Sequence, residues 1–168
     1  ASDVYKRQII NTGVGGSLDP ELHICDVVIA ESLVQHDMDT SPLGDPVGLI
    51  SGINIVNIPC DGRVTAALLK AAEALDGVHT AAGVIASGDQ FIASTEAKKR
   101  IVDRFGARVC EMEGAAIAQV CYINSVPFAI VRAVSDCADG SSHMAYEEFL
   151  PNAAATAARL IEGFVRVY

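Results

Sequence analysis

Phe-Ala-Ile-Val-Arg-Ala-Val-Ser-Asp, residues 128–136, is the segment of this chain that says most about its fold class. Its nearly unbroken apolar run is typical of a strand buried on both faces, as in the parallel sheets of α/β proteins. Ser135 and Asp136 follow directly after the last apolar residue. Polar residues at the carboxyl end of such a strand lie at the ligand crevice of α/β sheets. The segment therefore predicts an α/β fold with a functional site at the end of this strand.

Apolar runs of strand length alternate with stretches of helical period on both sides of this segment. That alternation is typical of a layered α/β domain. Asp61 and Ser94 are suited to cap the first two helices, and Pro151 should bend the last helix or shift its start. We expect strands at residues 9–12, 27–33, 53–58, 81–86, 108–110 and 128–134, and helices at 62–75, 95–105, 113–123 and from about 146 onward.

The composition, 51% hydrophobic and 20% charged over 168 residues, is that of one globular domain and not of a disordered chain. The net charge of -9 would repel a phosphate backbone, so we expect no nucleic-acid partner and interpret the basic run at residues 98–100 as a solvated helix face. No apolar segment approaches the length of a membrane span, and we expect a cytoplasmic protein without a membrane partner. The cysteines and histidines show no ligand spacing, so we expect neither a metal nor a cofactor.

Two candidate motifs follow predicted strands in the first half of the chain. Asn-Thr-Gly-Val-Gly-Gly-Ser, residues 11–17, is predicted to be a glycine-rich turn whose backbone can approach a ligand, with a plain tight turn as the alternative. It is neither a Walker loop nor a dinucleotide fingerprint. Ser-Gly-Asp-Gln-Phe-Ile, residues 87–92, leaves the strand predicted at 81–86. There Phe91 can stack on a base or, alternatively, belong to the core.

Two further motifs in the second half carry acids. Cys-Glu-Met-Glu-Gly, residues 110–114, places two glutamates at the start of an alanine-rich helix. We expect Glu113 to be partly buried and to need a partner, although acids at a helix N-terminus also interact favourably with the helix dipole alone. Val-Arg-Ala-Val-Ser-Asp, residues 131–136, brings Arg132 and Asp136 to the end of the buried strand, with an ordinary ion pair and turn as the alternative.

In this order, the four motifs resemble the nucleoside phosphorylase and nucleosidase family, most closely its methylthioadenosine/S-adenosylhomocysteine nucleosidase branch. The resemblance covers residues 9–165 and includes Gln-His-Asp-Met-Asp at 35–39. It implies a three-layer nucleoside phosphorylase-like fold, with a central mixed twisted sheet flanked by helices. It also implies hydrolysis of the N-glycosidic bond of methylthioadenosine and S-adenosylhomocysteine, which releases adenine and the 5-thioribose product in methionine salvage and the activated methyl cycle.

The resemblance gives a role to most candidate side chains. Asp136 would donate a proton to purine N7, and Glu113 would bind the ribose hydroxyls. Phe91 would stack on adenine, the backbone of Ile92 would bond its Watson–Crick edge, and Met112 would lie beneath the sugar. Protonating the base while positive charge grows on the ribose divides the barrier between acid catalysis and electrostatic stabilisation. The remaining substrate-binding residues implied are Arg132 on the water side, Ser135 orienting Asp136, Glu111, Val14, Gly15 and Gly16.

The segment between residues 35 and 59 is dense in turn-forming residues and longer than a simple connection. From composition alone, a functional loop and a plain excursion are both open. By the resemblance, Thr40 to Leu43 would enter the alkylthio pocket of a neighbouring subunit. That role implies a homodimer whose subunits complete one another's substrate pockets.

The chain also departs from the family pattern. Val14 stands where many members have a hydroxyl residue in the glycine-rich segment. We expect residues 1–8 to be a non-native leader, which leaves 9–168 as a single nucleoside phosphorylase-like domain without its N-terminal part and without the acid that positions water. Two alternative functions stay open: a purine nucleoside phosphorylase, which would need basic phosphate ligands, and a catalytically dead nucleoside-binding fragment.

Overall fold

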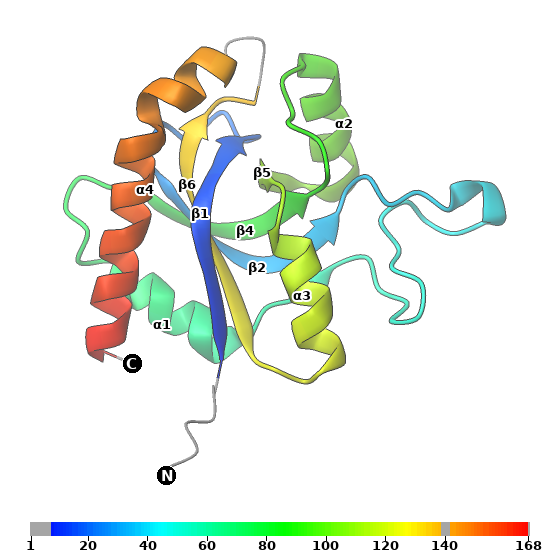
Figure 1. The fold of residues 1–168 in the computed structure, drawn as a ribbon, viewed down its shortest axis with the longest axis horizontal. Coiled ribbons are helices and arrows are strands. Elements are labelled where there is room, and N and C mark those ends of the chain that lie inside the picture. The colour runs from blue at the N-terminus through cyan, green and yellow to red at the C-terminus, as the bar shows by residue number, and fades with distance from the viewer. Residues whose placement is uncertain (1–7, 139–141, 168) are drawn as a thin grey trace.

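The computed structural model describes residues 8–138 and 142–167, which form a mixed β-sheet with helices around it (Figure 1). The strands are β1 (Ile9–Ser17), β2 (Val27–Gln35), β3 (Ile58–Pro59), β4 (Thr80–Ser87), β5 (Ala107–Glu111) and β6 (Phe128–Asp136). The helices are α1 (Gly62–Ala72), α2 (Thr95–Phe105), α3 (Gly114–Ile123) and α4 (Ser142–Val167), with a short 3-10 helix, η1 (Ser41–Leu43), in the long loop after β2. The predicted α/β class is confirmed.

The sheet closes on itself. Its strand order is β3-β2-β4-β5-β1-β6, and β2 also pairs with β6, so the five longer strands form a barrel with β3 attached to the outside of β2. β1 is parallel to β6, and β4 is parallel to both β2 and β5. β1 and β5 are antiparallel and pair only through their last residues, Gly16 with Cys110 and Ser17 with Val109. The carboxyl ends of β1, β5 and β6 therefore meet at one place.

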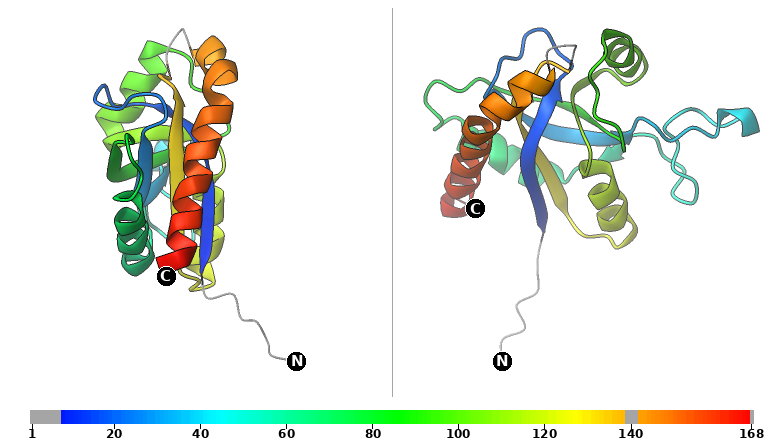
Figure 2. Two further views of the ribbon diagram at one scale, coloured as in Figure 1. Left: turned by 90° about the vertical axis from the view of Figure 1, so that its left-hand side faces the viewer. Right: turned by 45° about the horizontal axis from the view of Figure 1, so that its top comes forward.

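Apolar side chains hold the helices against this barrel. α1 and α4 pack together and against β1, β2 and β6, through a cluster that includes Val27, Leu68 and Leu160. α3 packs on another side through a cluster that includes Leu33 and Ala118. Figure 2 shows all four helices outside the sheet, with α4 running along β1 and β6.

Helix α2 begins and ends where the sequence predicts. The Ser94 hydroxyl accepts a hydrogen bond from the Ala97 N–H, and Gly106 ends the helix in the left-handed conformation at φ 60°. At α1, Asp61 accepts from the N–H groups of Arg63 and Val64, as expected of a cap.

Other boundaries differ from the prediction. A strand at 53–58 is wrong, because only Ile58–Pro59 pairs with β2, while Ile50 and Ile55 form an isolated bridge around a turn. Asn54 in that turn has a φ of 56°, which a strand excludes. Helix α1 ends at Ala72 instead of 75, and α4 begins at residue 142, so that Pro151 lies inside it and the helix bends in its first turns (Figure 2).

Candidate active site

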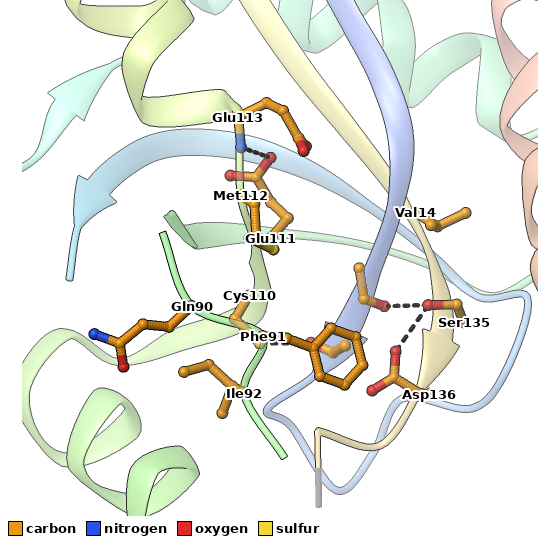
Figure 3. A pocket seen from close by; sticks show the side chains of 12 residues that line it. Val14, Gln90, Phe91, Ile92, Cys110, Glu111, Met112, Glu113, Ser135 and Asp136 are labelled. Atoms are coloured by element: carbon orange, nitrogen blue, oxygen red, sulfur yellow. Dashed lines mark hydrogen bonds between the residues drawn. The ribbon is translucent and has the colours of Figure 1, made fainter. Parts of the chain in front are cut away.

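A cavity of about 270 Å³ opens where β1, β5 and β6 end, and it brings the four motifs together (Figure 3). Ten of its lining residues are among the predicted site residues: Val14, Gly15, Gly16, Phe91, Ile92, Glu111, Met112, Glu113, Ser135 and Asp136. Gln90 and Cys110 also line it. Both residues belong to the recognised motifs, but no separate sequence signal distinguishes them as site residues.

Asp136 is held at the end of β6 by bonds to both of its carboxylate oxygens. Only 2% of the residue is exposed. The Ser135 hydroxyl donates to Oδ1 at 2.8 Å, and the Ala138 N–H donates to Oδ2 at 3.0 Å. The same Ser135 oxygen lies 3.4 Å from the carbonyl oxygen of Gly15 (Figure 3). A buried carboxylate with fixed partners at the wall of a cavity has a defined direction toward a ligand.

The prediction of a glycine-rich turn is wrong, because the segment is part of β1. Its register against β6 shifts between Gly15 and Gly16, at the level of Asp136. A Cβ on Gly15 would come within 2.6 Å of the Val109 side chain, and a Cβ on Gly16 within 2.9 Å of Asp136 Oδ2. Glycine is therefore needed here because strands approach closely around the acid, a reason that local sequence does not reveal.

A buried ion pair underlies the cavity. The Arg132 guanidinium bonds the Glu111 carboxylate, and each side chain is 1% exposed. Arg132 also donates to Asn11 Oδ1 at 2.6 Å and to the Val131 carbonyl at 2.9 Å. Arg132 does not line the cavity. The resemblance implies that Arg132 helps to hold the water side of the site; in the structure its guanidinium lies behind Glu111, which it binds.

Both carboxylate oxygens of Glu111 accept hydrogen bonds from other residues. It accepts from the Ser87 hydroxyl and from the N–H groups of Glu113 and Gly114 at the start of α3. The Ser87 oxygen in turn accepts from the Ala115 N–H at 2.7 Å. Glu111 therefore satisfies the free amides of α3, which is the work of a helix cap.

The expectation that Glu113 is partly buried is wrong. Its side chain is 65% exposed and makes no capping bond of its own. The physical reason is that Glu111 already occupies the amides at the start of α3, which leaves the Glu113 carboxylate on the cavity wall. Its Oε2 lies 3.4 Å from Arg132 Nη2, so the cation of the buried pair also orients Glu113.

Phe91 and Met112 are exposed on the cavity wall, so Phe91 does not belong to the core. Phe91 is 48% exposed, whereas the neighbouring Ile92 is buried. An exposed ring beside a cavity can stack on a planar ligand. Cys110, by contrast, is buried, and burial raises the pKa of its thiol to about 12, so this side chain is a neutral lining group.

The long loop after β2 extends away from the barrel (Figure 1) and does not line the cavity. Thr40 bonds Asp45 within the loop, and Leu43 in η1 is exposed. At the base of the loop, Asp37 accepts from the Asp89 N–H at 2.7 Å, which ties the loop to the segment that carries Phe91. Burial alone would raise the pKa of Asp37, but bonds from Gln35 and Asp89 and the nearby His36 hold it below its usual value.

Within residues 8–138 and 142–167, no group of three or more His, Cys, Asp or Glu side chains is arranged to hold a metal ion. None of the helices in the described part of the chain is long and apolar enough to cross a membrane.

Comparison with known proteins identifies the family. Residues 3–166 match the family model of the phosphorylase superfamily. The chain is 40% identical over 156 residues to a 5'-methylthioadenosine/S-adenosylhomocysteine nucleosidase of Haemophilus ducreyi, and this match covers 92% of this chain and 66% of that protein. It is 39% identical over 159 residues to an aminodeoxyfutalosine nucleosidase of Helicobacter pylori, which covers 95% of this chain and 68% of that protein.

A solved structure agrees with these sequence matches. The 5'-methylthioadenosine/S-adenosyl homocysteine nucleosidase of Helicobacter pylori, in complex with an aminopyrrolopyrimidine linked to a thioether-bearing pyrrolidinol, matches with a TM-score of 0.91 at 38% identity. The match covers 96% of this chain and 69% of that one, so the chain spans about two thirds of the length of these relatives. The nucleoside phosphorylase-like fold is thereby confirmed. The chain, over nearly its whole length, belongs to the phosphorylase superfamily.

Proposed function

We propose that this chain hydrolyses the N-glycosidic bond of 5'-methylthioadenosine and S-adenosylhomocysteine, releasing adenine and the 5-thioribose product. The observation that carries the proposal is the buried Asp136 carboxyl, fixed by Ser135 and Ala138 at the wall of a cavity that also exposes the Phe91 ring. The relatives named as 5'-methylthioadenosine/S-adenosylhomocysteine nucleosidases support it. The same reaction would serve methionine salvage and the activated methyl cycle.

In the proposed reaction Asp136 is the acid. Its proton goes to N7 of the adenine ring, and the bond between N9 and C1' breaks with its electron pair moving to the base. Water then adds to C1' and gives up one proton to the solvent, from which Asp136 is reprotonated for the next turnover. Phe91 stacks on the departing ring, Ile92 bonds its edge through the backbone, and Met112 lies beneath the sugar. A neutral adenine leaves far more readily than an adenine anion, and a positioned acid typically contributes about 10²- to 10⁴-fold to such a step.

Glu113 is the proposed ribose-binding carboxylate. As the base leaves, C1' gains positive charge, which a nearby anion stabilises more in the transition state than in the ground state. The Glu113 carboxylate is on the cavity wall, and Arg132, 3.4 Å away, is already paired with Glu111. Its charge is therefore available to the sugar.

Water is favoured over phosphate as the nucleophile by the lining of the cavity. Among the described residues, no lysine, arginine or histidine lines it, and Arg132 is buried behind Glu111. A phosphorylase needs cations or free amides that contact the phosphate oxygens. Hydrolysis needs neither.

A second candidate substrate is aminodeoxyfutalosine. Relatives in Helicobacter pylori and Campylobacter jejuni, 39% and 38% identical, are named aminodeoxyfutalosine nucleosidases. The proposed chemistry at Asp136 is unchanged, because the substrates differ only beyond the reacting bond. The 5' substituent is the part of the substrate that would distinguish them.

The experiment compares adenine release from 5'-methylthioadenosine in phosphate-free buffer by the wild type, Asp136→Asn and the control Asp103→Asn. Asp103 is an exposed residue of α2 that pairs with Lys99. We expect Asp136→Asn to lower kcat by about 10²- to 10⁴-fold, and Asp103→Asn to leave it unchanged. A rate that depends on phosphate would indicate a phosphorylase instead. Binding of 5'-methylthioadenosine without release by a folded wild-type chain would contradict the enzyme proposal and favour a nucleoside-binding protein.

We further propose that the chain acts as a cytoplasmic homodimer. Helix α3 exposes Val120 and Ile123, and η1 exposes Leu43. Large apolar side chains gathered on one helix face are typical of an interface. A symmetric pairing through α3 would let Thr40 to Leu43 of each subunit reach the other subunit's substrate. The five cysteines are free thiols, in keeping with a reducing compartment.

A further inference from the structure

Lys98 of α2 connects three parts of the chain that surround Asp136. Its ammonium donates to the carbonyl oxygens of Ser17 and Cys137, each at 2.9 Å, and the side chain is half-buried. Ser17 is the last residue of β1, and Cys137 directly follows Asp136. The sequence interpretation of the basic run 98–100 as a solvated helix face is therefore wrong for Lys98, although it fits Lys99, whose ammonium pairs with Asp103 in solvent.

The turn that Lys98 holds is one that needs support. Ala138 has a φ of 49°, in the left-handed region that is unfavourable for any residue other than glycine. In this conformation its N–H bonds Asp136 Oδ2. The bond from Lys98 to the Cys137 carbonyl fixes the peptide group between Cys137 and Ala138, and that peptide group supplies the N–H.

The second carbonyl that Lys98 binds, that of Ser17, belongs to the end of β1 beside Asp136. Ser17 follows Gly16, which pairs with Asp136 across β1 and β6 and on which an added Cβ would lie 2.9 Å from Asp136 Oδ2. One cation therefore joins the end of β1, which lies beside the carboxyl group, to the peptide group that follows Asp136. A charged donor makes such bonds stronger than a neutral one would.

We propose that Lys98 is a positioning residue, which holds the Asp136 carboxyl in the direction needed for proton donation by clamping the Ser17 and Cys137 carbonyls. This inference rests on the proposed function of Asp136 as the acid. A displacement of a reacting group by about 1 Å can cost about 10²-fold in rate. Lys98 does not line the cavity, so its loss should change the chemical step and leave substrate binding nearly intact.

The test uses Lys98→Met, which keeps the aliphatic stem and removes the ammonium, with Lys98→Arg as the conservative variant and Lys99→Met as the matched control. We expect Lys98→Met to lower kcat for 5'-methylthioadenosine by about 10- to 100-fold with KM within about twofold, because positioning and not binding is lost. Lys98→Arg should recover most of the rate, and Lys99→Met should equal the wild type. A wild-type kcat in Lys98→Met would overturn the proposal.

A double-mutant cycle separates positioning from general support of the fold. In the Asp136→Asn background, Lys98→Met should change the residual rate by less than about twofold, because residues that act as one unit are non-additive. An equal loss in both backgrounds would show that Lys98 supports the structure without acting through Asp136.

Hydrogen exchange of the Ala138 amide gives a readout that does not require turnover. Relative to the Val131 amide inside β6, we expect it to exchange at least about tenfold faster in Lys98→Met and to keep its protection in Lys98→Arg. Unchanged protection in Lys98→Met refutes the clamp. An inactive wild type with the expected exchange pattern would contradict the proposed nucleosidase function while leaving the clamp supported.

Discussion

Replacing Arg132 by methionine tests the buried ion pair beneath the cavity. The change removes the guanidinium and leaves the Glu111 carboxylate, 1% exposed, without its cation. Loss of one member of a buried pair typically costs about 3–5 kcal/mol. Glu111 would still accept from the Ser87 hydroxyl and from the N–H groups of Glu113 and Gly114. We therefore expect the lower end of that range, about 3 kcal/mol in the free energy of unfolding.

The assay is urea denaturation of wild type and variant, read as the change in midpoint at an unchanged m value. For a chain of this size, about 3 kcal/mol also corresponds to a fall in Tm of about 6–12 °C. The control is Arg63→Met, because Arg63 is highly exposed and pairs only loosely with Asp61, at 3.7 Å. We expect the control to stay within about 0.5 kcal/mol of the wild type.

A second variant tests whether the cost comes from the orphaned charge. Glu111→Gln in the Arg132→Met background removes that charge while keeping an oxygen for the α3 amides. We expect it to recover at least about 1 kcal/mol, because replacing both members of a buried pair is far less costly than breaking it. An Arg132→Met variant as stable as Arg63→Met, or a double variant no more stable than Arg132→Met, refutes the reasoning.

Two further predictions concern the strand ends and the apolar face of α3. Gly16→Ala places a Cβ within 2.9 Å of Asp136 Oδ2, so kcat should fall by about 10²-fold, whereas the control Gly62→Ala, whose Cβ meets nothing within 4 Å, should keep the wild-type kcat. Steady-state assays with 5'-methylthioadenosine check this prediction, and equal rates in the two variants would contradict it. Ile123→Glu puts a charge on the exposed face of α3 and should shift the sedimentation of the protein from dimer to monomer, whereas the control Glu73→Gln, at the exposed C-cap of α1, should not. A wild-type chain that sediments as a monomer would contradict the proposed homodimer.

The parts of the fold that local sequence predicts are those with local causes. Helix α2 is bounded by Ser94 and Gly106, and both act through hydrogen bonds or dihedrals within a few residues. The buried run at 128–136 likewise predicts β6 and the position of Asp136, because burial on both faces needs only apolar side chains. The grouping of Phe91, Glu113 and Asp136 at one cavity came from the resemblance of the motifs and not from any spacing between them.

The parts that local sequence does not predict depend on residues distant in the chain. The three glycines at positions 13, 15 and 16 are compatible with a turn or a strand, and only the approach of Val109 and Asp136 to β1 distinguishes the two. The closure of the barrel through β2 and β6 has no local signal either. Lys98 has the same sequence neighbourhood as Lys99, and its role follows from two carbonyls that are 81 and 39 residues away.

Glu111 is buried and Glu113 is exposed for one physical reason. The two residues lie at the transition from β5 to α3, where the Glu111 carboxylate turns inward and the Glu113 carboxylate turns outward. The inward one meets Arg132 and the amides of α3, so its charge is balanced within the protein. Because the Arg132 guanidinium is already paired with Glu111, it does not neutralise Glu113, although Glu113 Oε2 lies only 3.4 Å from Arg132 Nη2. The charge of Glu113 therefore remains on the cavity wall. On the other side of the cavity, Ser135 and Ala138 donate to Asp136, and in the proposed reaction these bonds would stabilise its carboxylate after proton transfer. In the proposed reaction, the site therefore favours negative charge at both walls at the moment when the ribose becomes positive, and this complementarity depends on the buried pair of Arg132 and Glu111.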